Sequence, residues 1–165
     1  MKTIFFVRHA KSSWEDMTLG DKARPLNPRG KRDAPFMAKL LKGKGTKADA
    51  IIASPANRAF TTAKYFAEEL GIGKEDIIVK EEIYEAYTED VLEIISNLDN
   101  QLNTVLIFGH NPTFTSLANR YSKEYIPNVP TCGIIKIESS VEQWSSFDPD
   151  NARVTDILFP KEYLS

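Results

Sequence analysis

The sequence contains few of the residues that build metal sites and covalent cross-links. Among 165 residues there are one cysteine and two histidines. One cysteine excludes an intramolecular disulfide framework and any zinc or iron–sulfur site with several cysteine ligands. Two histidines are too few for a His-rich metal site. We therefore expect no metal and no cofactor, and imidazole chemistry has only two positions at which to occur.

Long apolar runs and an excess of one charge are also missing. The first apolar run, Ile4–Val7, ends at Arg8 and is too short for a signal peptide. No other run approaches the ~18 residues of a membrane span. With 21 Lys and Arg against 23 Asp and Glu, the net charge of −2 argues against nucleic acid or an anionic membrane as the main partner. We expect a cytoplasmic protein, and a single thiol fits a reducing compartment.

The composition that remains is that of a folded soluble protein. Apolar residues make up 42% of the chain and charged residues 27%, which distinguishes it from a disordered chain. A chain of 165 residues can bury a core without disulfides or structural metals. Since no internal repeat, low-complexity tract or linker divides the chain, we expect residues 1–165 to form a single domain.

Short apolar runs alternate with helical stripes along the chain. Continuous β-branched and aromatic runs, typical of strands covered on both faces, occur at 3–7, 50–53, 77–79 and 104–108. Amphipathic helices are expected at 28–42, 55–70, 88–98 and 112–122. Two further strands, with no convincing helix between them, are expected at 132–138 and 154–159. This pattern predicts an α/β three-layer sandwich with a mostly parallel central sheet and a less regular C-terminal edge.

Local signals predict where these helices begin and end. Asn27 suits a cap and Pro28 the first helical position, while Pro35 predicts a kink or a restart near Ala34. Gly71 is expected to end the second helix. The remaining helices are expected to begin at the capping residues Ser54, Thr88 and Asn111.

Both histidines directly follow a predicted strand. Ligands of open α/β sheets bind outside the carboxyl ends of the strands, so His9 and His110 are expected to share a site. A third strand end leads to Arg58, in the first turn of a helix. A cation there disfavours the helix itself, but it fits an anion held by the guanidinium and the free N–H groups. Taken alone, each histidine could be structural and the segment before Arg58 could be an ordinary helix start. Taken together, the two histidines and Arg58 predict a shared pocket that also includes Arg8.

This set of residues suits phosphate chemistry. Arginine binds phosphate oxygens through two parallel hydrogen bonds, and a neutral histidine nitrogen is a nucleophile toward phosphorus. The neighbouring guanidiniums disfavour the imidazolium form and help to keep His9 neutral at pH 7. His110 can donate a hydrogen bond to the charged equatorial oxygens. Because phosphoryl transfer needs mainly positioning and charge neutralisation, no metal is required.

The order Arg8-His9, then Ser54-Pro55-x-x-Arg58-Ala59, then Gly109-His110 resembles the histidine phosphatase superfamily, also called the phosphoglycerate mutase-like fold. The segments RHAKSSW at 8–14 and RPLNPRG at 24–30 resemble its small SixA-like phosphohistidine phosphatase branch. The resemblance implies that His9 accepts the phosphate transiently and that Arg8, Arg58 and His110 complete the pocket. It also implies an acidic proton donor after the third strand.

Glu85 is the candidate for this proton donor, and Glu82 is the nearby alternative. A solvated acidic loop is the other interpretation of this stretch. Two positions depart from the pattern of many relatives, which have Gly in place of Ala10 and Asn in place of Glu15. A carboxylate near a phosphate is repulsive, so Glu15 is expected to point elsewhere, toward Lys11 or Arg24.

Lys11, Ser12 and Arg24 are candidate substrate contacts at the pocket mouth, where a basic rim would attract an anionic substrate. Exposed charges in a polar loop are the alternative for Lys11 and Arg24. Trp14 either covers the site or packs under the loop. Simple packing roles are expected for Cys132, Trp144 and Phe147.

The leading hypothesis is a metal-independent phosphatase that works through a phosphohistidine intermediate on His9. Little of the chain is available for a lid beyond 10–27 and 123–131, and an open site suits a phosphate carried by a protein, including phosphohistidine. The alternatives are a small-molecule phosphomonoesterase with the same chemistry and a non-catalytic phosphoprotein-binding module. A metal-dependent hydrolase is less well supported, because two histidines without clustered acids are a poor ligand set.

Overall fold

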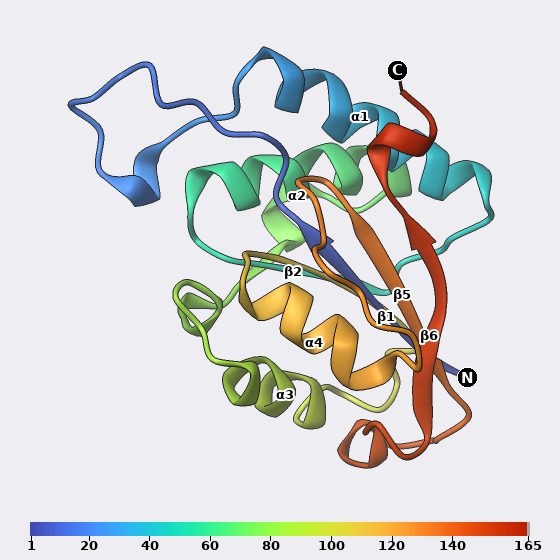
Figure 1. Cartoon of the computed structure of the whole chain (residues 1–165). Coiled ribbons are helices and arrows are strands. Elements are labelled where there is room, and N and C mark those ends of the chain that lie inside the picture. Colours follow the sequence, from blue (N-terminus) through green and yellow to red (C-terminus); the bar gives the residue numbers. More distant parts are fainter. Residues whose placement is uncertain (165) are drawn as a thin grey trace.

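The computed structural model describes residues 1–164; Ser165, the last residue of the predicted domain, lies outside them. Its six-stranded sheet has the order β3-β2-β4-β1-β5-β6 (Figure 1). The first four strands run parallel, whereas β5 and β6 are antiparallel to their neighbours. The strands are β1 Lys2–Arg8, β2 Ala50–Ala53, β3 Ile78–Val79, β4 Thr104–Gly109, β5 Ile134–Ser139 and β6 Ala152–Leu158. The predicted mostly parallel sheet with a less regular C-terminal edge is therefore confirmed.

Two helices cover each face of this sheet. The helices are α1 Pro28–Gly43, α2 Asn57–Leu70, α3 Thr88–Ser96 and α4 Thr113–Tyr121. Buried residues of α1 and α2 pack with one side of the sheet, and those of α3 and α4 pack with the other. In Figure 1, α1 and α2 lie toward the top and α3 and α4 toward the bottom. The three-layer α/β class predicted from the sequence is confirmed.

The central strand β1 explains why its sequence is continuously apolar. Ile4 and Phe6 belong to the core under α3 and α4, while Phe5 and Val7 belong to the core under α1 and α2. All four side chains are at most 2% exposed. Because both faces of the strand are covered, no position between Ile4 and Val7 meets solvent.

The start of α1 agrees with the sequence, but its interior does not. The backbone N–H of Gly30 donates to the Oδ1 of Asn27 over 2.9 Å, so Asn27 is the cap. Of the kink or restart expected near Ala34, the restart is wrong, because α1 continues through Pro35 to Gly43. The burial of Ala34, Met37 and other residues on this face outweighs the single helical hydrogen bond that proline lacks. At the end of α2, Gly71 adopts the expected left-handed conformation, with φ of 75°.

The three predicted caps lie one or two residues from the observed ones, although the helix predicted from residue 88 does begin at Thr88. The helix α2 begins at Asn57, because the Ser54 hydroxyl turns to the His110 ring, 2.8 Å away, instead of capping a helical turn. Thr88 is the first residue of α3 and not its cap, since the Asp90 carboxylate accepts a hydrogen bond from the N–H of Tyr87, which is the cap. The helix α4 begins at Thr113, although Asn111 Oδ1 still accepts a hydrogen bond from its first turn.

Candidate active site

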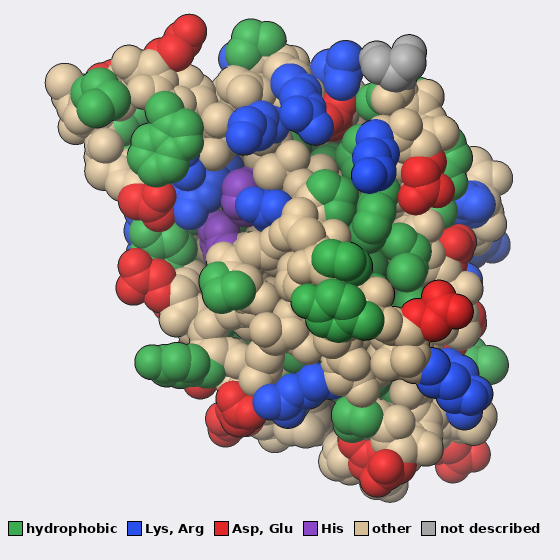
Figure 2. Space-filling model, in the orientation of Figure 1, with side chains coloured by type: hydrophobic (Ala, Val, Ile, Leu, Met, Phe, Trp, Pro, Cys, Tyr) green, Lys and Arg blue, Asp and Glu red, His purple; other side chains and the backbone are tan. Residues whose placement is uncertain are grey.

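The two histidines lie side by side at the carboxyl ends of adjacent strands. Because Arg8 pairs with Gly109 in the parallel β1–β4 ladder, the residues that follow them are neighbours. The rings of His9 and His110 lie with their centroids 5.2 Å apart. Figure 2 shows both in a hollow bordered by Lys and Arg side chains. The predicted meeting of the strand ends thus occurs in the structure.

The His9 imidazole is held in one orientation and one tautomer. Its Nδ1 lies 2.7 Å from the Ala10 carbonyl oxygen, which can only accept, so Nδ1 carries the proton and Nε2 keeps its lone pair. The pKa of His9 is lowered to about 3, chiefly by burial; the hydrogen bond to the Ala10 carbonyl opposes this shift, and the nearby His110, Arg58 and Arg8 add to it. His9 is therefore neutral at pH 7, with Nε2 available as a nucleophile.

Ala10 fits where many relatives have glycine. Its side chain is fully buried, and its backbone N–H donates to the Thr62 hydroxyl over 3.0 Å. The methyl group packs in the core between β1 and the helices α1 and α2. The alanine is therefore accommodated without exposing the backbone that follows His9.

His110 is held from two sides. Its Nε2 lies 2.8 Å from the hydroxyl oxygen of the buried Ser54, and the Tyr84 ring packs edge-on against the imidazole at 5.8 Å between centroids. Ser54 Oγ also accepts from the Ala56 N–H over 3.2 Å, so the hydroxyl that contacts the ring is itself held in place. The pKa of His110 is lowered to about 4, chiefly by burial; the charge of Arg58 contributes to this shift and that of Asp21 opposes it.

The guanidiniums of the pocket have donors without partners. Arg8 donates from one terminal nitrogen to the Val129 carbonyl over 3.0 Å, and Arg58 donates from both to Asp21. Within residues 1–164, the Nε atoms of Arg8 and Arg58, and the Nε and one terminal nitrogen of Arg24, are buried without a hydrogen bond. A buried donor without an acceptor is costly, so this arrangement suits a site that binds an anion.

Arg24 is not an exposed loop charge. It is 6% exposed, its guanidinium carbon lies 3.4 Å from the centroid of the Trp14 ring, and its Nε lies 3.3 Å from a carboxylate oxygen of Asp21. Trp14 is 67% exposed and covers Arg24 from the solvent side. The expected pairing of Glu15 with Lys11 or Arg24 is wrong, because Glu15 forms no ion pair in the described part of the chain and Arg24 pairs with Asp21.

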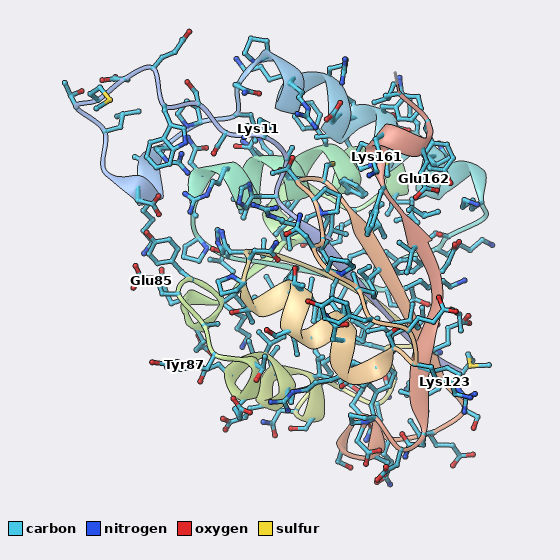
Figure 3. All side chains as sticks on the ribbon, viewed as in Figure 1. Lys11, Glu85, Tyr87, Lys123, Lys161 and Glu162 are labelled. Carbon is cyan, nitrogen blue, oxygen red and sulfur yellow. The ribbon has the colours of Figure 1, made fainter. Side chains whose placement is uncertain are left out.

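The other candidates of this loop take different positions. Ser12 is 7% exposed and pairs with Leu26 in a short antiparallel bridge. Lys11 is exposed and lies across the hollow from Glu85 in Figure 3. The backbone oxygen of Lys11 accepts from the Asn27 N–H and lies so close to Gly30 that an added Cβ would be 2.2 Å away. The loop is therefore anchored to the start of α1 at both of its ends.

Of the two candidate acids, Glu85 is the one on the His110 side. It lines a shallow pocket of about 350 Å³ together with His110, whereas Glu82 lines a separate pocket against α3. The Glu85 backbone has a positive φ of 57°, a conformation that is rare and strained for a residue with a side chain. Its carboxylate is exposed and extends outward in Figure 3.

Sequence reasoning missed Asp21 and Tyr84. The Asp21 carboxylate accepts from the Tyr84 hydroxyl over 2.6 Å and from Arg58 over 3.0 Å. These hydrogen bonds and the nearby charges of Arg58 and Arg24 lower the pKa of Asp21 despite an opposing effect of burial. In the sequence, Asp21 resembles a solvated turn residue; its position three residues before Arg24 is the only local signal.

Cys132 and the C-terminal aromatics are packing residues, as expected. Cys132 is fully buried, and burial raises the pKa of its thiol far above the usual range. Its backbone N–H donates to the carbonyls of Arg8 and His9, so it supports the loop that carries the nucleophile. Trp144 and Phe147 lie in the core beneath α3 and α4.

The described residues contain neither a cluster of metal ligands nor a membrane-spanning helix. Among residues 1–164, no three His, Cys, Asp or Glu side chains come together as a set of metal ligands. None of the helices in this range has the length and apolar character needed to cross a membrane.

Comparisons with known proteins agree with this geometry. A family model described as the histidine phosphatase superfamily (branch 1) matches residues 4–92, more than half of the chain. An uncharacterized protein of Mycobacterium tuberculosis is 29% identical over 94% of this chain and 100% of its own length.

Two solved structures have a similar fold. The putative phosphohistidine phosphatase SixA from Agrobacterium tumefaciens is 26% identical, with a TM-score of 0.80 over 95% of this chain and 97% of that one. A protein histidine phosphatase SixA complexed with tungstate is 22% identical, with a TM-score of 0.81 over 97% and 98% of the two chains. The predicted phosphoglycerate mutase-like class is thus confirmed, and the chain belongs to the histidine phosphatase superfamily.

Proposed function

We propose that this protein is a phosphatase that transfers the phosphoryl group of its substrate to the Nε2 of His9 and then hydrolyses the phosphohistidine. The observation that carries this proposal is a buried, neutral imidazole whose Nε2 is free, surrounded by guanidinium nitrogens that have no partner within residues 1–164. A site that only bound phosphate would need the arginines but not a nucleophile held in this tautomer.

The proposed reaction has two steps. In the first, the Nε2 lone pair attacks phosphorus, and the bond from phosphorus to the leaving oxygen or nitrogen breaks with its electron pair going to the leaving group. Arg8, Arg58 and His110 stabilise the negative charge of the equatorial oxygens. In the second, water attacks the phosphohistidine, the phosphorus–nitrogen bond breaks, and His9 and inorganic phosphate are released.

Glu85 is proposed as the proton donor to an ester leaving group. It shares a pocket with His110, and a rotation of its exposed side chain would bring the carboxyl toward the leaving group. This position favours a small-molecule phosphomonoesterase as the second candidate function, because an alkoxide leaving group needs a proton more than a phosphoramidate does.

The substrate proposed first is a phosphate carried by a protein, such as phosphohistidine. Large apolar side chains lie near the site: Trp14 is 67% exposed and stacks on Arg24, and Tyr87 is 78% exposed in the His110 pocket. Figure 2 shows hydrophobic side chains on the lobe beside the histidines. Exposed apolar groups around a polar pocket are typical of protein-binding surfaces. The SixA relatives, named as phosphohistidine phosphatases, support the same substrate class.

The first test is chemical labelling of the nucleophile. After incubation with a phosphodonor, we expect a phosphate on the protein that is labile in acid and stable in alkali, and that is absent from His9→Ala. Turnover is expected to be unchanged in a metal chelator, because arginines supply the positive charge. No label and no turnover with any donor would instead support the phosphoprotein-binding module, and loss of activity in the chelator would contradict metal independence.

The second test ranks the substrates. Rates are compared on a phosphohistidine protein, a phosphoserine peptide and sugar phosphates, with His9→Ala as the blank. Tyr87→Ser is expected to raise KM for the phosphoprotein but not for sugar phosphates. Tyr125→Ser is the matched control, because Tyr125 is 80% exposed and lies in a different groove, beside β6. Faster hydrolysis of sugar phosphates than of the phosphoprotein would favour the small-molecule alternative.

A further inference from the structure

We propose that Asp21 is a positioning residue that orients the Arg58 guanidinium, and through Tyr84 the His110 ring, for phosphoryl transfer. This inference rests on the proposed function of the pocket. It assigns a role to a carboxylate that lies among arginines expected to bind an anion, where a negative charge needs an explanation.

Asp21 holds Arg58 by two different groups. The Asp21 backbone oxygen accepts from one terminal nitrogen of Arg58 over 2.7 Å, and a carboxylate oxygen accepts from the other over 3.0 Å. Two acceptors on one residue fix both the position and the plane of a guanidinium, and bonds between charged groups are the strong ones. Since the Arg58 side chain leaves the first turn of α2, this contact sets its direction into the pocket.

The same carboxylate extends to the second histidine. The Tyr84 hydroxyl donates to it over 2.6 Å, and the Tyr84 ring packs edge-on against His110. Arg24 contacts the other carboxylate oxygen with its Nε at 3.3 Å. Asp21 lies in a short 3-10 turn, Asp21–Ala23, so one loop residue connects α2 to the segment that precedes α3. Displacing Asp21 would disturb Arg58 and Tyr84 together.

These bonds do not use every hydrogen-bond donor of the pocket arginines. The Nε of Arg58 is buried and has no acceptor within residues 1–164, and the same holds for the Nε of Arg8. Donors for an anion therefore remain while Asp21 stays in place. In a positioning role, the Asp21 carboxylate stays bound to Arg58 when the substrate binds. As an internal inhibitor it would instead compete with phosphate for Arg58 and would have to leave.

The two roles predict different kinetics for Asp21→Asn. The amide removes a negative charge near the anion site, so phosphate binding is not weakened, whereas the looser guanidinium is placed less well in the transition state. We expect kcat to fall about tenfold, because misplaced groups lose the advantage of orientation. KM and the inhibition constant of inorganic phosphate are expected to stay the same or fall. Asp21→Glu, which keeps the charge, is expected to recover part of the lost kcat.

Asp16→Asn is the matched control. Asp16 lies in the same loop, but its carboxylate accepts hydrogen bonds only from the backbone and hydroxyl of Thr18. We expect its kcat to equal that of the wild type. Tyr84→Phe keeps the Arg58 contacts and removes the hydroxyl, so it provides a second variant with a smaller expected fall in kcat, about threefold. Thermal melts establish that each variant is folded.

Two results with these variants would overturn the proposal, each in favour of a different explanation. A higher kcat, or an unchanged kcat with a lower KM, in Asp21→Asn would overturn the proposal in favour of competition with phosphate. Equal losses in Asp21→Asn and Asp16→Asn would overturn it in favour of a general effect on the loop. Failure of the proposed function is recognised independently, since the wild type would then form no phosphohistidine and show no turnover.

Discussion

The two ends of β1 each hold a cation, fully buried at the amino end and partly buried at the carboxyl end, and they differ in how many of its donors are used. At the amino end, Lys2 is 2% exposed and its ammonium donates to the carbonyls of Asn100 and Leu102 and to the side chain of Asn103. At the carboxyl end, Arg8 donates to the Val129 carbonyl, and its Nε is buried without a partner in the described residues. An ammonium has three donors and Lys2 uses all of them, whereas the guanidinium of Arg8 does not.

We propose that this difference separates a structural cation from one that binds a ligand. Satisfied donors stabilise the fold, because removing the cation would leave buried carbonyls unpaired. Unsatisfied donors cost stability until an anion arrives. The position agrees, since ligands of such sheets bind at the carboxyl ends of the strands. Arg58 belongs with Arg8, because its Nε is likewise unpartnered within residues 1–164.

The largest expected effect comes from removing a cation at the carboxyl end. In Arg58→Gln we expect kcat/KM to fall about 10³-fold, the lower limit for an arginine that stabilises a phosphoryl-transfer transition state. Thermal stability is expected to change little, because the loss of the two hydrogen bonds to Asp21 is opposed by the relief of the repulsion between Arg58 and Arg8. Steady-state kinetics and a thermal melt on the same preparation measure both quantities. A stable and fully active variant would contradict a ligand-binding role for the cations at the carboxyl end of β1.

At the amino end of β1 we expect a loss of stability without a loss of activity. Lys2→Met is expected to lower the free energy of unfolding by about 3 kcal/mol, because two backbone carbonyls and one side-chain oxygen lose a charged donor. The kcat/KM of the folded variant is expected to stay within about twofold of the wild type, as the change is at the opposite end of the strand. Urea unfolding and kinetics test this, and a loss of activity at unchanged stability would contradict it.

The third test of the comparison concerns acid stability. The pKa values of His9 and His110 are lowered to about 3 and about 4, below the usual 6.5, so between pH 6.5 and 4 the unfolded chain binds protons that the folded protein does not. Stability should therefore fall as the pH drops through this range, by roughly 1.4 kcal/mol per pH unit for each histidine.

Urea unfolding at pH 7, 6 and 5 measures this slope. A double variant with His9→Asn and His110→Asn should be much less sensitive to pH, whereas Lys2→Met should keep the wild-type slope because its end of the strand carries no histidine. Equal slopes in the wild type and the double variant would show that other groups dominate acid unfolding.

Much of the fold could be predicted because its signals are local. The continuous apolar run of β1 indicated a strand covered on both faces, and Gly71 indicated the end of α2. The predicted cap at Ser54 is wrong because a side chain distant in the sequence competes for its hydroxyl. Ser54 turns to His110, which is 56 residues away in the chain.

The sequence by itself determined that two histidines and two arginines would stand at strand ends of a parallel sheet, because hydrophobic periodicity and helix-start residues are properties of neighbouring positions. Only the tertiary structure decided that Arg24 is buried under Trp14 and that Asp21 holds Arg58 and Tyr84. These partners are 37 and 63 residues from Asp21. Their pairing depends on how a polar loop packs over α2, and no periodicity in that loop encodes it.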